Sequence, residues 1–184
     1  CVYNNPKNDE RMVTVTRTYF LKTQRISFAV WQKTDLPLAK QLWGDPRVTH
    51  YIHQNGAFDP AEIATRLQTE INQEKTAAMQ YWPIFNLTTG QFIGCCGLKP
   101  VVNGAELGYH LRPEFWHQGY AAEAAAAVIH YAFNQLKLPQ LVAGHHPANL
   151  ASGIILRNLG FHFIGTEYYA PTGLEHPTYV LVPQ

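Results

Sequence analysis

Charged residues are few in this sequence, and neither sign of charge dominates. Asp, Glu, Lys and Arg make up 15% of the 184 residues, and the formal net charge is +1. A chain without a basic excess has no global electrostatic attraction for nucleic acid, so we expect no nucleic-acid partner. Hydrophobic residues make up 46% of the chain, which is typical of a globular protein with a core of ordinary size.

The sequence also lacks a long apolar run, a secretory signal and a cysteine framework. No stretch approaches the roughly 20 apolar residues of a membrane-spanning helix, so no membrane partner is expected. The opening stretch CVYNNPKNDER is polar and carries no signal-peptide core, and Met12 is another conceivable start. Cys1, Cys95 and Cys96 show neither zinc nor disulfide spacing, which favours reduced thiols and a cytoplasmic location.

Hydrophobic periodicity and turn residues predict an α/β (α+β) fold. We expect a single domain at residues 17–184, after an N-terminal leader at residues 1–16. Asp35 and Asp59 each precede a proline at the start of a predicted helix, where they can act as caps. Strands are predicted at residues 24–30, 80–87, 92–98, 105–111, 139–144, 161–166 and 177–182, and two further helices at residues 119–137 and 149–158.

The stretch EFWHQGYAAEAAAAVIHYAF, residues 114–133, contains an alanine-rich helix that opens without a capping side chain. Gly119 stands at the cap position and supplies no side-chain oxygen. The first backbone N–H groups of a helix have no partner within the helix, and the helix dipole makes this end attractive to anions. Local chemistry therefore allows either a phosphate site or an ordinary helix whose N–H groups face water.

Two segments of the sequence resemble motifs of one known family. WHQGYAAEA, residues 116–124, is similar to the pyrophosphate loop of the GNAT superfamily of N-acetyltransferases, and within it to the RimJ/RimL ribosomal-protein branch, where the motif tends to read Trp-Gly-x-Gly-Tyr-Ala-x-Glu-Ala. NLASGIILRNLGF, residues 149–161, resembles the family's Asn-x-x-Ser…Leu-Gly-Phe segment. The resemblance covers residues 20–183 and implies a mixed, mostly antiparallel splayed sheet of about seven strands, flanked by about four helices.

The resemblance also implies acetyl-CoA as cosubstrate, bound between the fourth and fifth strands of the family fold. The pantetheine would pair with the end of the fourth strand, and the pyrophosphate would take backbone amides of the loop. Asn149 would contact the pantetheine, and Ser152 would lie near the thiol. The implied cofactor-binding residues are His110, Leu111, Arg112, His117, Gln118, Gly119, Tyr120, Ala121, Asn149 and Ser152.

Two positions depart from the family pattern. His117 stands where the motif usually has glycine, so its side chain must point away from the phosphates or donate to them. Leu156 occupies the position where many relatives carry a tyrosine that acts as general acid. If the leaving thiolate is protonated, Ser152 or a water molecule must supply the proton. The alternative for Ser152 is a hydroxyl bonded to backbone within its helix.

Transfer to an amine needs the neutral amine, and Glu106 is our candidate base. Strand alternation places Glu106, Gly108 and His110 on one face. A water molecule is the other candidate, and Glu106 then becomes a solvated or salt-bridged hairpin residue. The catalytic candidates are thus Glu106 and Ser152. Paired histidines, such as His145 and His146, lack a third ligand at metal-binding spacing, which argues against a metal site.

We therefore expect an acetyl-CoA-dependent N-acetyltransferase that works by direct attack in a ternary complex. The amine acceptor is either a protein N-terminus or a small molecule, and the protein is a monomer or a homodimer. Residues 49–73 and the loop YYAPTGLEHP, residues 168–177, are expected to wall the acceptor site. The alternative function is a non-catalytic CoA-binding module with the same fold.

Overall fold

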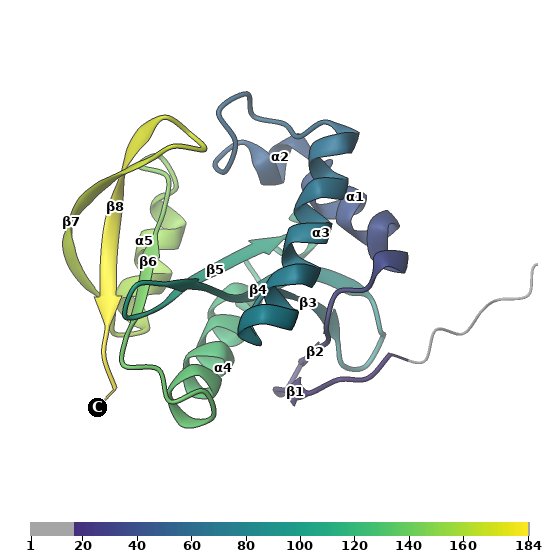
Figure 1. Cartoon of the computed structure of the whole chain (residues 1–184), viewed down its shortest axis with the longest axis horizontal. Coiled ribbons are helices and arrows are strands. Elements are labelled where there is room, and N and C mark those ends of the chain that lie inside the picture. Colours follow the sequence, from purple (N-terminus) through teal and green to yellow (C-terminus); the bar gives the residue numbers. More distant parts are fainter. Residues whose placement is uncertain (1–16, 184) are drawn as a thin grey trace, which may run out of the picture.

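The computed structural model describes residues 17–183, which form one eight-stranded sheet with helices on both faces (Figure 1). The strand order is β1-β2-β3-β4-β5-β6-β8-β7. All neighbouring strands are antiparallel except β5 and β6, which are parallel. The predicted class, a mixed and mostly antiparallel sheet, is confirmed. The leader predicted at residues 1–16 lies outside the described residues.

The described residues contain more elements than the sequence predicted. The strands are β1 (Leu21–Lys22), β2 (Ile26–Phe28), β3 (Tyr81–Asn86), β4 (Phe92–Val101), β5 (Gly104–Leu111), β6 (Leu141–Gly144), β7 (His162–Tyr169) and β8 (Leu174–Leu181). The α-helices are α1 (Leu36–Trp43), α2 (Pro46–Thr49), α3 (Pro60–Ala77), α4 (Tyr120–Asn134) and α5 (Leu150–Asn158), and 3-10 turns occupy η1 (Lys33–Asp35) and η2 (Pro113–Phe115). Neither β1 nor α2 was predicted, because each is too short to show a periodic pattern.

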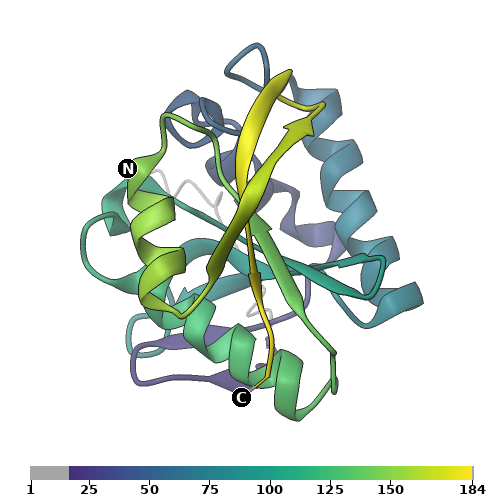
Figure 2. The same ribbon diagram turned by 90° about the vertical axis from the view of Figure 1, so that its left-hand side faces the viewer.

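The β7–β8 hairpin is longer than predicted. We expected residues 168–177 to form a loop, but β7 and β8 stay paired up to Tyr169 and Leu174, which leaves only residues 170–173 as the turn. Tyr168 and Tyr169 are residues that favour strands, and they extend the ladder across the predicted loop. Figure 2 shows this hairpin with α5 on one side and α3 on the other.

Two apolar cores lie on opposite faces of the sheet. The helices α1 and α3 cover one face, and the predicted apolar stripe of α3, at Ile63, Leu67 and Ile71, is buried there. Helix α4 covers the other face with its alanines. Cys95 contributes to the first core and Cys96 to the second, so the adjacent cysteines face opposite sides of the sheet as predicted.

The two predicted aspartate caps have different outcomes. Asp59 caps α3, with its carboxylate accepting from Ala61 N–H and Glu62 N–H, both at 2.8 Å. Asp35 stands at the start of α1 but makes no capping hydrogen bond. Its carboxylate instead accepts from the Arg17 guanidinium and from Gln32 N–H.

The central strands β5 and β6 separate after a short contact. They pair only at Ala105 with Leu141 and at Glu106 with Val142. Strand β6 continues alongside β8 instead, as far as Gly144 opposite Thr178. In Figure 1, β6 and β8 turn away from the direction of β5. The remainder of β5, residues 107–111, still pairs with β4 on one side. On its other side, where β6 has turned away, no strand of the described residues pairs with it.

Within residues 17–183, no helix combines the length and the hydropathy needed to cross a membrane.

Candidate active site

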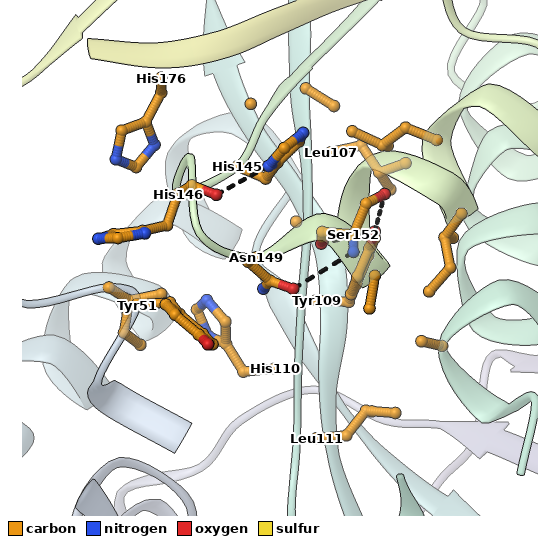
Figure 3. A pocket seen from close by; sticks show the side chains of 18 of the residues that line it. Tyr51, Leu107, Tyr109, His110, Leu111, His145, His146, Asn149, Ser152 and His176 are labelled. Carbon is orange, nitrogen blue, oxygen red and sulfur yellow. Dashed lines mark hydrogen bonds between the residues drawn. The ribbon is translucent and has the colours of Figure 1, made fainter. Parts of the chain in front are cut away.

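The separation of β5 from β6 opens a cavity of about 830 Å³. Its walls come from β5 and β6, the N-terminal ends of α4 and α5, the segment after α2, and the β7–β8 hairpin (Figure 3). Such a volume is near the upper end for cofactor and substrate pockets. Most of the residues that the sequence nominated for a site line this cavity, among them Glu106, His117, Gly119, Asn149 and Ser152.

The free edge of β5 presents backbone groups to the cavity. Arg112 N–H donates to Ile93 O on β4 at 2.9 Å, whereas Ala105 N–H points the other way, toward Gln140 O at 3.4 Å. Because backbone direction alternates along a strand, Leu107, Tyr109 and Leu111 direct their N–H and C=O groups toward the gap. Of these groups, the Leu111 carbonyl already accepts from Trp116 Nε1 at 2.7 Å.

This register revises part of the predicted pantetheine contact. Leu111 has backbone groups that face the gap, as that contact needs. The backbone groups of His110 and Arg112 point to β4 instead, where these residues lie opposite Cys95 and Ile93. Of the three predicted residues, Leu111 is thus the one whose backbone groups face the gap, together with those of Leu107 and Tyr109.

Helix α4 begins without a side-chain cap, as predicted. Gly119 is the cap residue, with φ +80° in the left-handed region, and the first helical hydrogen bond runs from Glu123 N–H to Gly119 O at 3.1 Å. The amides of residues 118–121 donate to no other residue in the described part of the chain. These N–H groups and the positive end of the helix dipole lie at the rim of the cavity, an arrangement that favours anions in general.

His117 also has a left-handed backbone, with φ +58°. This conformation suits glycine and costs another residue roughly 1 kcal/mol, which explains in physical terms why glycine fits the motif at this position. The His117 side chain is exposed and lies on the cavity wall.

Arg25 holds the loop before α4 in place, and the sequence analysis missed it. Its Nη1 donates to Gln118 O at 3.0 Å, its Nε contacts Glu123 at 2.6 Å, and its guanidinium lies 4.3 Å from the centre of the Tyr120 ring. Burial acts to raise the pKa of Glu123, but hydrogen bonds from Thr23 and Arg25 outweigh it and lower the pKa. Glu123 thus serves the loop as the anchor of Arg25.

Glu106 lies beside Tyr81 on the α3 side of β5. Its Oε1 accepts from the Tyr81 hydroxyl at 3.3 Å, and it forms no salt bridge among residues 17–183, although Lys99 lies opposite in the register. Tyr81 packs so closely on Gly108 that a Cβ there would meet the phenol at 2.4 Å. His110 also contacts Tyr81, so the predicted common face of Glu106, Gly108 and His110 is confirmed.

The environment of His110 keeps its ring neutral. Burial, followed by the charge of Arg66, lowers the pKa of His110 to about 3. Its Nδ1 accepts from Trp43 Nε1 at 3.3 Å and lies 3.7 Å from Cys95 Sγ. A neutral imidazole in these contacts orients the indole of Trp43, and it carries no charge toward the cavity at neutral pH.

Ser152 and Asn149 lie at the start of α5, across the gap from β5. Asn149 Oδ1 accepts from Ser152 N–H at 3.3 Å and so caps the helix (Figure 3). The Ser152 hydroxyl donates to Tyr109 OH at 3.0 Å. Burial raises the pKa of Tyr109 to about 12, which keeps the phenol protonated at neutral pH. Tyr109 was not nominated from the sequence, because only the fold brings it to Ser152.

The histidines beside the cavity are held by local contacts. His145 is buried, with Nδ1 donating to the His146 carbonyl at 2.9 Å and the ring stacked on Tyr179. His146 packs against Tyr51 and His176 (Figure 3). Within residues 17–183 no three residues among His, Cys, Asp and Glu are grouped as metal ligands.

The two segments predicted to wall the acceptor site meet above the cavity. Gln54 N–H, in the segment after α2, donates to Pro171 O in the β7–β8 turn at 2.7 Å. A second cavity of about 490 Å³ lies on the α3 side of this region. Four side chains line both cavities: Arg66, Tyr81, Glu106 and Tyr169.

A split central sheet and an uncapped helix beside the split are the fold features that we expected of an acyl-CoA-dependent transferase. A family model described as acetyltransferase (GNAT) domain matches residues 25–162, and the chain belongs to this family. It is an acetyl-CoA-dependent acetyltransferase.

Named relatives and solved structures agree with this assignment. The chain is 30% identical to an uncharacterized N-acetyltransferase, p20, of Bacillus licheniformis, over 77% of this chain and 81% of the relative. It is 26% identical to an FsC-acetyl coenzyme A-N(2)-transacetylase of Aspergillus fumigatus, over 89% of this chain and 75% of the relative. The fold is similar to that of the RimL ribosomal alpha-N-protein acetyltransferase in complex with coenzyme A, with a TM-score of 0.72, 18% identity, and coverage of 87% and 95% of the two chains.

Proposed function

We propose that this protein transfers the acetyl group of acetyl-CoA directly to a primary amine, in a ternary complex, with Glu106 as base. The observation that carries this proposal is the position of Glu106, whose side chain lines both cavities. The larger cavity has room for the donor, and the smaller one gives the acceptor a separate entrance. A carboxylate where the two meet is placed to receive a proton from an amine that attacks the thioester.

For the donor, we propose that the amides of residues 118–121 bind the pyrophosphate. The uncapped helix end supports this assignment, and Arg25, held against Gly119, adds a positive charge nearby. The pantetheine would lie along β5 and pair with Tyr109 and Leu111. This path ends beside Asn149 and Ser152, which are thus proposed to flank the thiol.

The proposed reaction forms a C–N bond and breaks the C–S bond of the thioester. The amine nitrogen attacks the carbonyl carbon, and the proton that it loses passes to Glu106 directly or through water. The thiolate leaves and takes the proton of the Ser152 hydroxyl, which regains a proton from solvent water, while Glu106 releases the amine proton to solvent, so both side chains return to their starting states. An α-amine with a pKa near ~8 costs only about 1 kcal/mol to deprotonate at pH 7, against roughly 4–5 for lysine, so a weak base is sufficient for the former.

The acceptor is proposed to be either a protein N-terminus or a small amine. Likeness to RimL, a protein acetyltransferase, supports the first, and the loop WHQGYAAEA supports the RimJ/RimL-like branch. Likeness to the FsC-acetyl coenzyme A-N(2)-transacetylase of Aspergillus fumigatus supports an acceptor other than a protein N-terminus. We also propose a cytoplasmic location, which is supported by Cys95 and Cys96 as buried free thiols.

One experiment distinguishes the proposed acetyltransferase from the alternative function, a CoA-binding module without catalysis. Thermal unfolding is followed with and without CoA, and thiol release from acetyl-CoA is followed with a panel of peptides, amino acids, polyamines and aminoglycosides. We expect both stabilisation by CoA and turnover with at least one amine. Stabilisation without turnover on any acceptor favours the binding module, and no stabilisation by CoA contradicts both functions.

A further inference from the structure

Arg66 of α3 is a cation without an anionic partner in the acceptor region. Its guanidinium lies 4.7 Å from the centre of the Trp43 ring and 5.7 Å from that of Phe58. Its Nε is buried and has no hydrogen-bond partner among residues 17–183, and Arg66 forms no salt bridge there. An arginine stays charged in any protein environment, so the site holds a positive charge and a free donor.

The carboxylates of Glu70 and Glu106, which line the smaller cavity with Arg66, are engaged elsewhere. Glu70, one turn further along α3, is buried, and its Oε2 accepts from Tyr81 N–H at 2.8 Å. Burial raises the pKa of Glu70 more than the charge of Arg66 lowers it. Glu106 accepts from the Tyr81 hydroxyl. Arg66 therefore lines both cavities without an anionic partner, beside the proposed base Glu106.

We propose that Arg66 binds a carboxylate of the acceptor, so that the acceptor is an amino acid or a similar amine that carries an anionic group. This inference rests on the proposed function. The planar guanidinium offers paired N–H donors that match a carboxylate, and the Trp43 and Phe58 rings hold it in place. An acceptor with its amine at Glu106 and its carboxylate at Arg66 brings no net charge into the site.

At Arg66 itself the same arrangement disfavours further ammonium groups, although Asp59, Glu62, Glu70 and Glu106 also line the smaller cavity. A polyamine or an aminoglycoside whose first amine lies at Glu106 would bring further ammonium groups toward Arg66. Like charges in a partly dry cavity repel, and the free donor of Arg66 would remain without an acceptor. Among the small-molecule acceptors that the proposed function leaves open, Arg66 thus favours amines that carry an anionic group over polyamines and aminoglycosides.

The test compares amino acids with their own α-carboxamides in the thiol-release assay. Each pair differs only in the anionic group, and the amide has the less basic amine, which favours it in intrinsic reactivity. We expect kcat/KM to be at least about tenfold higher for the acids, as for other single polar recognition groups. Dipeptides with Asp or Asn as second residue, tested alongside, show whether the carboxylate is that of a free amino acid or of a peptide side chain. Equal rates for acid and amide in every pair contradict the proposal.

Variants locate the effect at Arg66. For Arg66→Gln we expect KM to rise at least about tenfold for the acid acceptor, with no change for its amide and none in KM for acetyl-CoA. Arg66→Lys should retain part of the preference. Lys75→Gln removes an exposed positive charge from the same helix and should match the wild type. If Arg66→Gln weakens acid and amide equally while CoA still stabilises it, Arg66 has no anion-binding role.

Binding measurements test the proposed anion site at Arg66 without requiring turnover. Calorimetric titration of the CoA-saturated wild-type protein with each acid and amide needs no catalysis. Tighter binding of the acid than of the amide supports the anion site even if no acceptor is acetylated, a result that contradicts only the proposed function. Equal binding of the two contradicts the anion site even if an amine is acetylated. If Arg66→Gln does not fold, the Arg66→Lys variant and the wild-type comparison still decide the question.

Discussion

The Ser152 hydroxyl donates to the phenol oxygen of Tyr109 at 3.0 Å, across the gap between α5 and β5. This pair provides hydroxyl groups on the thiol side of the proposed site, where Leu156 occupies the position of the tyrosine that many relatives carry. Because burial raises the pKa of Tyr109 to about 12, the phenol of this pair stays protonated at neutral pH.

Loss of the Ser152 hydroxyl should slow acetyl transfer. We expect Ser152→Ala to lower kcat about 100-fold, since a positioned proton donor contributes at least this much, and Tyr109→Phe to have a smaller effect. KM for acetyl-CoA should change little in either variant. Thiol-release kinetics measure all of these values. An unchanged kcat in Ser152→Ala would leave Tyr109 or water as the proton source for the thiolate, and the Tyr109→Phe variant distinguishes the two.

A negative side chain at the start of α4 should remove donor binding. In Gly119→Glu, a carboxylate stands among the free amides of residues 118–121 and repels the pyrophosphate. We expect stabilisation by CoA to vanish in thermal unfolding. The control is Gly90→Glu, because Gly90 also has a left-handed backbone, with φ +71°, and a Cβ there meets open space. The proposal for the pyrophosphate site fails if both variants keep the same response to CoA.

Neutralising Glu106 should affect the chemical step more than donor binding. We expect Glu106→Gln to lower kcat by roughly 10- to 100-fold with an α-amine acceptor and to leave KM for acetyl-CoA unchanged. The loss should shrink as the pH is raised, because more of the amine is then already neutral. Glu175→Gln changes an exposed acid of β8 and serves as control. A wild-type rate in Glu106→Gln points to water as the base.

The Arg25–Glu123 pair should make stability depend on pH in the acidic range. The pKa of Glu123 in the folded protein is below its ordinary value of 4.5, so the folded state binds this proton less readily than the unfolded chain does. The stabilisation is therefore complete above pH 4.5 and is lost as the pH falls through the lower folded value. Because the pair is partly solvent-screened, we expect about 0.5–1 kcal/mol.

Urea unfolding of the wild type and of Glu123→Gln at several pH values measures this contribution. The difference in free energy of unfolding should be constant from pH 7 to 5 and should narrow below pH 4.5. If the difference in free energy of unfolding between the wild type and Glu123→Gln stays the same below pH 4.5, the Glu123 side chain stabilises the fold through packing and not through its charge.

The parts of the site that depend on local sequence were predictable. The uncapped start of α4 follows from Gly119 and its neighbours, and the start of α5 follows from Asn149. The shared face of Glu106 and His110 follows from strand alternation. Each of these features is encoded within about one turn or one strand, where residue spacing translates directly into geometry.

The parts that depend on tertiary contacts were not predictable. Arg25 reaches the loop before α4 from 93 residues away. Tyr81 meets Glu106 because β3 lies beside β4, and Arg66 joins them only when α3 packs on the sheet. Which backbone groups of β5 face the gap depends on its register with β4. No pattern in one sequence specifies such pairings, because many registers satisfy the same alternation of residues.

The separation of β5 from β6 has a mechanical consequence. Among residues 17–183, only two backbone register pairs join β5 to β6, and so the strands on one side of the sheet to those on the other. A pantetheine chain bound along residues 107–111 would take the place of a ninth strand and bridge the two halves. The donor would then hold the two halves together as well as supply the acetyl group, and the free energy of this stabilisation would rise with the logarithm of its concentration over its dissociation constant.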